Sequence, residues 1–506
     1  MFTDFTFEDW LAAPEDKREL IQKIINAYRG SAEFRTALTA QAYFSTENEE
    51  IKNKFIVQLG AYEQKVAVTD PSTGEVLKDE NGNPIMETRM VKNETKVEGT
   101  RISSGFFFRL VTQQSQHLLG NGVTLKDTAL KKRLGRAFDT ALASMGEKAL
   151  VDGVCWGFWN KDHVEVIRAA KDASSGAVAL LGEEDAEPHV LIQFWRLNEK
   201  KPLYVRTYEP DGVTQYRADS EGKLQETKPK RAYITKTIKD GFGAMKAGEN
   251  NYSGVLPVIP LYANPEHRSE LTTAVKSKID CFDRIASDFG DNLQMANDIY
   301  WVLNNFGGSS KEILATLAQI KELRAIANIS DGSGSGSTVE PHTFEVPYEA
   351  RRVALDILKV EIYFDFMGLD TKSITGGSLT NVAIRAASKD INLKCDRWEW
   401  CAFDFVQNTL RLQGVDTEEI SFVRQPLENE TETIENIYRA AEDLDRETRL
   451  RKNPMISQDE IPQIMKDKAA EEVSGLDSLD RLKKEIQKAN NPTPEDEEED
   501  EDAGQS

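Results

Sequence analysis

The chain has 506 residues, with 63 Lys and Arg against 85 Asp and Glu, and its formal net charge is -22 at pH 7. No apolar stretch approaches the ~20 residues of a membrane-spanning helix, and the acidic first residues do not form a signal peptide, so we expect neither membrane insertion nor secretion by a cleaved signal. The length predicts roughly two to four domains, and the acidic balance disfavours tight, non-specific adhesion to DNA.

The first part of the chain predicts helices interrupted by an extended arm. Apolar residues recur at helical spacing within residues 1–60, and helical spacing returns over 100–150, where Gly120-Asn121-Gly122 is a stop signal. Between these segments, alternating residues and two turn sequences predict a long, exposed β-arm at 62–92.

The β-rich part of the chain lies at 154–262. Turn residues separate short runs with β propensity, and consecutive strands without intervening helices predict an antiparallel sheet, so the predicted fold class is α+β. The predicted strands are 189–195, 203–208, 213–217 and 231–238. Aromatic residues in this part suit either base stacking or core packing, and the scarcity of nearby basic residues favours core packing. These residues are Trp156, Phe158, Trp159, Phe194 and Trp195.

Two long helices are predicted on either side of a small insert. The first extends from about Ser269, a candidate N-cap, to Asn304, and Gly290 inside it is expected to mark a bend. The second begins at Pro347 and gathers its apolar residues on one side. The insert at 305–346 predicts a short helix, a strand-like run and a flexible Gly/Ser loop tip. The apolar side of the second helix is Ala350, Val353, Ala354, Ile357, Leu358 and Ile362.

The last part of the chain begins with a polar loop that contains a glycine pair. From Leu379 to about Gln413 the pattern predicts one helix of about 34 residues. A strand-like run at 420–424 follows, then short, charged helices over 427–472 that Asn453-Pro454 and Ile461-Pro462 interrupt, and an acidic end that is predicted to be disordered. Candidates for the packed face of the long helix are Val382, Ala386, Ile391, Trp398, Phe405 and Leu412.

Sequence patterns of catalysis and cofactor binding do not occur. The sequence has no G-x-x-x-x-G-K-[ST], G-x-G-x-x-G, H-E-x-x-H or C-x-x-C motif. Its five histidines stand apart, and four cysteines in 506 residues cannot form a disulfide framework, so we expect reduced thiols in an intracellular protein. We predict no catalytic residues, no metal ligands and no cofactor, and hence a protein that is not an enzyme.

The order of these elements, together with several local motifs, resembles the portal proteins of tailed bacteriophages, and most of all the SPP1-type family. The likeness covers roughly residues 40–470, and it depends on the order and spacing of motifs that are weak individually. The segments that carry it are Tyr43-Phe44, Leu118 to Gly122, Val255 to Leu261, Val346 through Thr375-Gly376-Gly377-Ser378 to Glu399, and Ile420 to Pro426. Leu379-Thr380-Asn381 departs from the family pattern, in which a further Gly and an Ala are frequent.

The resemblance implies a portal-type fold in which the chain forms a ring, usually of twelve subunits, at one vertex of an icosahedral capsid. The implied parts are a wing at 1–265 with the β-arm 62–92, stem helices at 266–304 and 347–369, a clip at 305–346, a tunnel loop at 370–380, a long wing helix and strand at 381–425, a helical crown at 426–475 and an acidic tail at 476–506.

The resemblance also implies a function and a set of partners. The ring would be the conduit for double-stranded DNA during packaging and ejection, without sequence specificity, and the docking site for the terminase large subunit and the head–tail adaptor protein. Major capsid and scaffolding proteins would be further partners, no membrane would be involved, and the protein would be located in the virion and, during assembly, in the host cytoplasm.

Two groups of residues are predicted to act in this function, and Met367-Gly368 is expected to serve as the hinge of the tunnel loop. The DNA-channel residues are Lys372, Ser373, Thr375, Gly376, Gly377 and Ser378. The partner-binding residues of the clip are Lys311, Glu312, Lys321, Glu322 and Arg324. The alternative is a non-enzymatic helical scaffold or capsid-associated protein that binds only protein partners.

Overall fold

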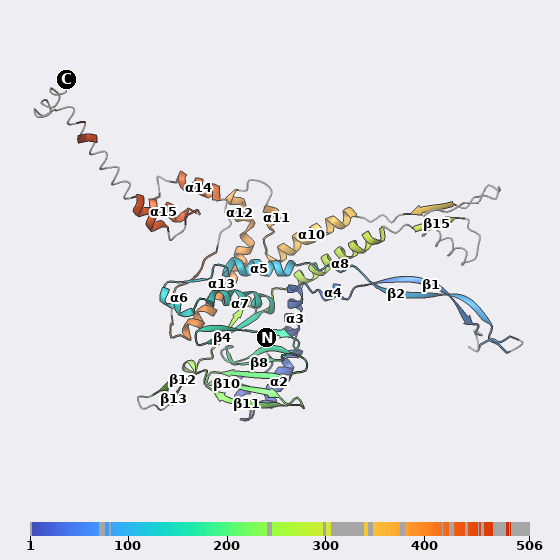
Figure 1. Cartoon of the computed structure of the whole chain (residues 1–506), viewed down its shortest axis with the longest axis horizontal. Coiled ribbons are helices and arrows are strands. Elements are labelled where there is room, and N and C mark those ends of the chain that lie inside the picture. The colour runs from blue at the N-terminus through green and yellow to red at the C-terminus, as the bar shows by residue number, and fades with distance from the viewer. Residues whose placement is uncertain are drawn as a thin grey trace, which may run out of the picture. The chain divides into compact units, whose positions relative to one another are not determined.

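The computed structural model describes residues 3–69, 76–79, 82–239, 245–296, 300–304, 338–342, 348–374, 380–416, 418–424, 430–440, 444–453, 455–456, 460–468, 482–484 and 486. The chain forms two compact units (Figure 1). The first unit consists of Met1–Asp370 and Asp390–Gln425, and the second of Thr371–Lys389 and Pro426–Ser506.

The N-terminal helices of the first unit form where the apolar spacing predicted them. They are α1 (Phe7–Ala12), α2 (Arg18–Gly30), α3 (Ala32–Phe44) and α4 (Glu49–Lys52). Thr6 caps α1 in a capping box with Asp9, and the Ser31 hydroxyl accepts from the Phe34 N–H at the start of α3. The apolar stripe of α2 is completely buried: Ile21, Ile24, Ile25 and Tyr28.

The β-rich part of the first unit is antiparallel, as predicted. Six strands pair in the order β11-β10-β9-β8-β7-β6, and three more in the order β14-β4-β5. The strands are β4 (Val154–Asn160), β5 (His163–Arg168), β6 (Ala170–Asp172), β7 (Ser175–Leu181), β8 (Pro188–Trp195), β9 (Tyr204–Glu209), β10 (Gly212–Ala218), β11 (Leu224–Arg231) and β14 (Val258–Tyr262). The mixed helix and antiparallel-sheet class is thereby confirmed.

The predicted strand at 231–238 is confirmed for residues 234–238, but these residues lie outside the six-stranded sheet, because the chain leaves that sheet after Arg231. β11 ends at Arg231, and β12 (Ile234–Lys239) pairs with β13 (Met245–Asn250) in a separate hairpin. Between them, the Tyr233 hydroxyl donates to the Glu209 and Gly212 carbonyl oxygens, at 2.6 and 3.1 Å. These two bonds hold the bend at which the chain departs.

Aromatic residues of this part pack in the core, as predicted. Trp156, Phe158, Trp159 and Phe194 are buried and Trp195 is half-buried. Phe194 contacts Tyr28 of α2 edge to face, with ring centroids 6.2 Å apart. The helices α1, α2 and α3 therefore pack on the six-stranded sheet through apolar and aromatic side chains.

A second group of helices packs together, although α13 comes much later in the sequence than α5, α6 and α7. Its elements are α5 (Phe106–Leu119), β3 (Val123–Leu125), α6 (Thr128–Leu134), α7 (Phe138–Asp152), α13 (Lys389–Arg411) and β17 (Ile420–Phe422), which pairs with β3. Gly157 of β4 lets Phe405 of α13 approach closely, because a Cβ at Gly157 would lie 2.8 Å from the Phe405 ring. Ile391, Trp398 and Phe405 are buried, as predicted for the packed face.

The single long helix predicted from Leu379 to Gln413 is two helices. α12 (Asn381–Ala387) ends at Ser388, and α13 begins at Lys389. The Ser388 hydroxyl donates to the Ile384 and Arg385 carbonyl oxygens, at 2.9 and 3.3 Å, and competes there with the helical backbone bonds. In consequence Val382 and Ala386 are exposed and do not belong to the packed face, and Leu412 is half-buried.

The β-arm is an antiparallel hairpin of β1 (Phe55–Ala67) and β2 (Met86–Glu98). Its register runs from Phe55 opposite Glu98 to Ala67 opposite Met86. The strands begin at Phe55 and end at Glu98, so the arm is longer than the predicted 62–92 segment by several residues on each strand.

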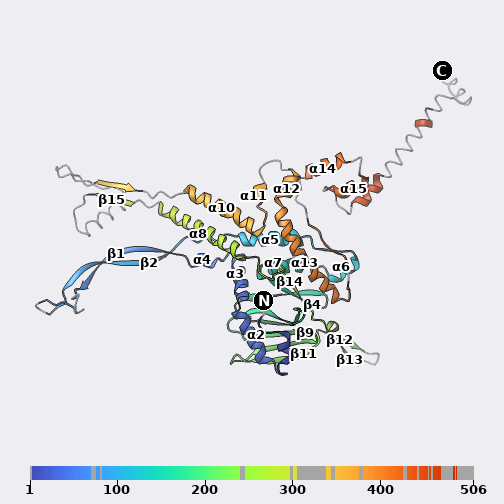
Figure 2. The same ribbon diagram turned by 180° about the vertical axis from the view of Figure 1, so that it is seen from behind.

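Two long helices of the first unit lie side by side (Figures 1 and 2): α8 (Thr273–Ala296) and α10 (Tyr348–Phe366). The prediction that the first of them extends from Ser269 to Asn304 is wrong at both ends. Its first turn is capped by the Thr272 hydroxyl, which accepts from the Val275 N–H, and residues beyond it form β15 (Tyr300–Asn304) paired with β16 (Thr338–His342). The predicted helix, strand-like run and loop tip of the insert lie outside the described residues, and β16, which follows them, was not predicted.

The second unit contains short helices. They are α11 (Thr371–Ile374), α12, α14 (Glu430–Arg439) and α15 (Arg446–Lys452). α11 occupies the first part of the segment predicted as a polar loop, and Pro462 lies in the first turn of a helical run at 461–468, so it starts a helix where an interruption was expected. The Asn381 N–H at the start of α12 donates to Glu432 of α14, at 2.6 Å. No helix in the described ranges is long and apolar enough to span a membrane.

Candidate interface at the α8–α10 helix pair

The helix pair α8–α10 is held together by charged and aromatic contacts. Lys278 of α8 pairs with Glu361 and Asp365 of α10, at 2.9 and 2.8 Å between Nζ and the carboxylate oxygens. Phe106 of α5 contacts both helices edge to face, with its ring centroid 4.9 Å from that of Phe282 on α8 and 6.1 Å from that of Tyr363 on α10. The pair is therefore a defined structural element and not two independent helices.

The side of α10 opposite the buried Ile362 and Phe366 carries an apolar stripe that is exposed in the single chain. Val353, Ile357, Val360 and Phe364 are 53, 57, 60 and 69% exposed, at spacings of four, three and four residues. The predicted single apolar side of this helix is thus divided, because Ile362 packs inward. We call these four residues the α10 stripe. A contiguous exposed apolar stripe of this kind marks a surface that another molecule covers.

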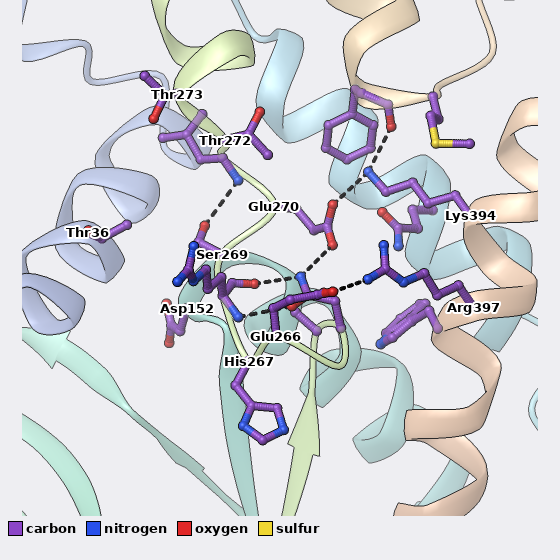
Figure 3. A pocket seen from close by; sticks show the side chains of 18 of the residues that line it. Thr36, Asp152, Glu266, His267, Ser269, Glu270, Thr272, Thr273, Lys394 and Arg397 are labelled. Carbon is purple, nitrogen blue, oxygen red and sulfur yellow. Dashed lines mark hydrogen bonds and ion pairs between the residues drawn. The ribbon is translucent and has the colours of Figure 1, made fainter. Parts of the chain in front are cut away.

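A cavity of ≈ 780 Å³ lies at the base of the helix pair. Figure 3 shows Lys394 and Arg397 reaching from α13 toward Glu270 and Glu266. The Lys394 ammonium lies 2.7 Å from Glu270 and donates to the Phe366 carbonyl oxygen at 2.8 Å, and both charged side chains are 12% exposed. Burial lowers the pKa of Lys394. This cluster joins α13, the start of α8 and the end of α10.

The charged residues of this cavity pair with one another. Glu270 also accepts from the Asn264 side chain, at 2.9 Å. No group of three or more His, Cys, Asp or Glu that could hold a metal ion occurs in the part of the chain that the structure describes. The four cysteines are free, and burial raises the pKa of the Cys155 and Cys395 thiols to about 12, which makes them poor nucleophiles.

Asp152 lines the same cavity and is completely buried beside Arg168 and Gln41. Burial raises its pKa from 3.8 to about 6, although Arg168 acts against this shift. The folded chain therefore binds this proton more tightly than the unfolded chain, and the Asp152 contribution to the free energy of unfolding falls as the pH rises from about 4 to about 6. It is constant above that range.

We expect Asp152→Asn, which cannot titrate, to gain stability relative to the wild type by on the order of 2–3 kcal/mol between pH 4 and pH 7. Denaturant unfolding of both proteins at several pH values measures this difference. The exposed Asp162 is the control, because its hydrogen bond to His163 lowers its pKa, so Asp162→Asn should show no such change above pH 4. A difference for Asp152→Asn that does not vary with pH would contradict the assignment.

The predicted hinge, Met367-Gly368, forms the capped end of α10, and its role as a hinge stays a prediction. Met367 adopts a left-handed conformation, with φ 61°, and the Gly368 N–H donates to the Tyr363 carbonyl oxygen in a helix cap. A Cβ at Gly368 would collide with Leu110. Gln113 donates to and accepts from the Leu369 backbone, at 2.9 Å each. The chain is thus anchored up to the segment predicted as the tunnel loop.

Few of the predicted site residues lie within the part of the chain that the structure describes. Lys372 lies in α11 and is exposed, and Ser373 lies in the same helix. The other predicted channel residues, Thr375, Gly376, Gly377 and Ser378, lie outside the described residues. So do the predicted clip residues Lys311, Glu312, Lys321, Glu322 and Arg324.

A row of buried polar residues on α8, which we call the ladder, was not predicted from the sequence: Asp283, Ser287 and Asp291. Three backbone N–H groups of the segment before α5 donate to it: Thr100 to Asp291 at 2.6 Å, Ile102 to Ser287 at 3.0 Å and Ser104 to Asp283 at 2.9 Å. Gly290 belongs to this contact, since a Cβ there would lie 2.7 Å from the Thr100 methyl carbon, and α8 continues as one helix through it. The signal in the sequence is the four-residue spacing of the ladder, which resembles an ordinary solvated face.

We call the residues just before β1 (48–54) and just after β2 (100–104) the root of the hairpin. The part of the root before β1 also contacts α8. The Asn48 side-chain amide donates to Asp283 at 3.0 Å, and the Tyr43 hydroxyl donates to Asp280. Lys54 pairs with Asp288 and Asp291, at 2.7 Å each. Both strands of the β1–β2 hairpin therefore leave from a root attached to α8.

Comparisons with known proteins give three findings. The family model described as phage portal protein, SPP1 Gp6-like, matches residues 61–491. The portal protein of Clostridium phage phiCD119 is 29% identical over 139 residues, which are 28% of this chain and 30% of that relative. A solved structure described as the neck of an empty GTA particle, computed with C6 symmetry, aligns with a TM-score of 0.41 and 10% identity over 70% of this chain and 91% of the solved chain.

Proposed function

Because the chain belongs to the SPP1 Gp6-like family of phage portal proteins, we propose that it assembles into a ring at one capsid vertex, through which double-stranded DNA enters during packaging and leaves during ejection. The matched segment of the phiCD119 portal protein spans 30% of that relative's length, so the activity of the whole protein is part of this proposal.

The observation that carries the proposal is the α10 stripe. An exposed row of large apolar side chains on a rigid helix pair is costly in a single chain and is stabilised when another copy covers it. A ring needs contacts between two different surfaces of each subunit, so that every copy both offers and covers a stripe. The acidic composition suits a channel that repels phosphate and lets DNA slide.

The proposed assignment of parts follows the family. The chain before α8, together with α13, forms the wing, and α8 and α10 form the stem. The insert between them is the clip, which docks the terminase large subunit and later the head–tail adaptor protein. The loop that includes Gly376 and Gly377 faces the channel, the helices of 426–475 form the crown, and the protein acts without catalysis.

Capsid assembly with and without this chain tests the proposal. Capsids that carry the chain should protect phage DNA from nuclease, and closed capsids assembled without it should protect none, because no vertex would admit DNA. Equal protection in both samples would contradict the conduit function. Failure to form any capsid without the chain would favour the alternative, a scaffold that binds only protein partners.

A further inference from the structure

The ladder and α10 lie on opposite sides of α8. Lys278, which pairs with α10, and Ser287, at the centre of the ladder, are nine residues apart. At about 100° per residue, nine residues place these two positions about 180° apart around the helix. In both views α8 lies between α10 and α4, where the hairpin root begins (Figures 1 and 2).

The ladder fixes the direction in which the root runs along α8. Residues 100, 102 and 104 donate to residues 291, 287 and 283, so the extended segment is antiparallel to the helix. Two residues of extended chain advance about 6.6 Å, and four residues of helix advance about 6 Å, so the two spacings match over three successive bonds. The root is therefore held along α8 and not at a single point.

These two features give each chain two different flanks. One flank is the α10 stripe, and the other is the root of the β1–β2 hairpin on the far side of α8. Starting from the ring proposed above, we propose that the hairpin of one copy lies across the α10 stripe of the neighbouring copy. The contact is heterologous, the kind that closes a ring when every copy repeats it.

The hairpin has the composition that this contact needs. Its register pairs Ile56 with Val97 and Tyr62 with Val91, positions that fall on one face of the ribbon. The pairs between them on that face are Gln58 with Thr95 and Gly60 with Asn93, so this stretch of the face carries no charge. From 56 to 62 a strand advances about 20 Å, and from 353 to 364 a helix advances about 16 Å. The uncharged face thus matches the stripe in length.

The hairpin also requires support. β1 and β2 form a two-stranded sheet in the described part of the chain, and a ribbon of two strands is marginally stable in water unless a third element packs on it. A neighbouring α10 would supply that element, and the hairpin would in turn remove the stripe from water. Each surface therefore supplies what the other lacks.

Photo-cross-linking of assembled rings tests this contact. A chain with Val91→p-benzoylphenylalanine, labelled with ¹⁵N, is mixed with unlabelled chains before assembly, irradiated and digested. Mass spectrometry should find labelled peptides around residue 91 joined to unlabelled peptides from 348–366. The same cross-linker at Glu94, which falls on the opposite face of the ribbon, is the control and should give few such products.

Failure of this inference can be distinguished from failure of the ring proposal. Rings in which the cross-links from position 91 join other surfaces, or only residues of the same chain, would overturn the hairpin contact alone. Absence of rings in any preparation of the wild type would overturn both. As a second variant, replacement of residues 56–97 by a short Gly/Ser turn should raise the concentration at which rings form by at least about tenfold, since it removes apolar cover from the stripe. An unchanged concentration would contradict the contact.

Discussion

Ile357→Asp is expected to abolish ring assembly and to leave the single chain folded. Ile357 is more than half exposed in the single chain, so its replacement removes little packing there and should change the free energy of unfolding by about 0.5 kcal/mol or less. In a ring, the same position would lie in an apolar contact. An unpaired carboxylate there would weaken the free energy of association by roughly several kcal/mol at each of the repeated interfaces. Light scattering should therefore report a single chain where the wild type forms a large particle.

Leu197 offers a matched control for this substitution. It is 70% exposed in the turn between β8 and β9, away from the α10 stripe. Leu197→Asp makes the same chemical change, an exposed aliphatic side chain to aspartate, and should leave the particle mass unaltered. Rings formed by Ile357→Asp, or an equal loss of rings in both variants, would show that the stripe is not the contact.

Asp283→Ala is expected to destabilise the first unit by about 3–6 kcal/mol, because two hydrogen bonds to a buried carboxylate are worth about 1.5–3 kcal/mol each. Asp283 is completely buried and accepts from the Ser104 N–H and the Asn48 amide. The Ser104 N–H would lose this acceptor, and the Asn48 amide would keep only Asp280, at 3.2 Å. Denaturant unfolding measures the loss, and hydrogen exchange should be faster at residues 100–104 than in the wild type.

Asp288 lies on the same helix and controls for the general loss of a carboxylate. Its side chain is half exposed, and its partner Lys54 keeps a second carboxylate, Asp291. Asp288→Ala should therefore cost about 1 kcal/mol or less. If Asp288→Ala and Asp283→Ala destabilise the chain equally, the ladder does not hold the hairpin root as described.

Two kinds of signal predicted elements correctly. The apolar periodicity of a half-buried helix predicted α2, and runs of β propensity between turn residues predicted β8, β9 and β10. β4 and β7 are buried along nearly their whole length, so their residues do not alternate and no individual strand was predicted there. Periodicity is informative only where burial differs between faces.

The points at which a helix ends within a long apolar pattern were not predicted, because they depend on contacts that the periodicity of the sequence does not show. The break at Ser388 arises from its hydroxyl and not from a loss of helical spacing, and the end of the fixed segment after α10 depends on Gln113, which lies far away in the sequence. The ladder on α8 was missed for a related reason. Asp283, Ser287 and Asp291 have the composition of a solvated face, and only the approach of the segment before α5 shows that they are buried.

The candidate interface was predictable in part. The apolar spacing of α10 was visible in the sequence, whereas its division into a buried and an exposed side required the position of α8. The channel and clip residues followed from the family resemblance, and their roles stay predictions.

The mass of the particle formed by the purified full-length chain, measured together with negative-stain images of it, tests most directly whether the chain assembles into a ring. We expect a closed ring of about twelve copies of the 56.8 kDa chain, with an open channel along its axis. A monomer or dimer at every concentration tested would contradict the proposed function.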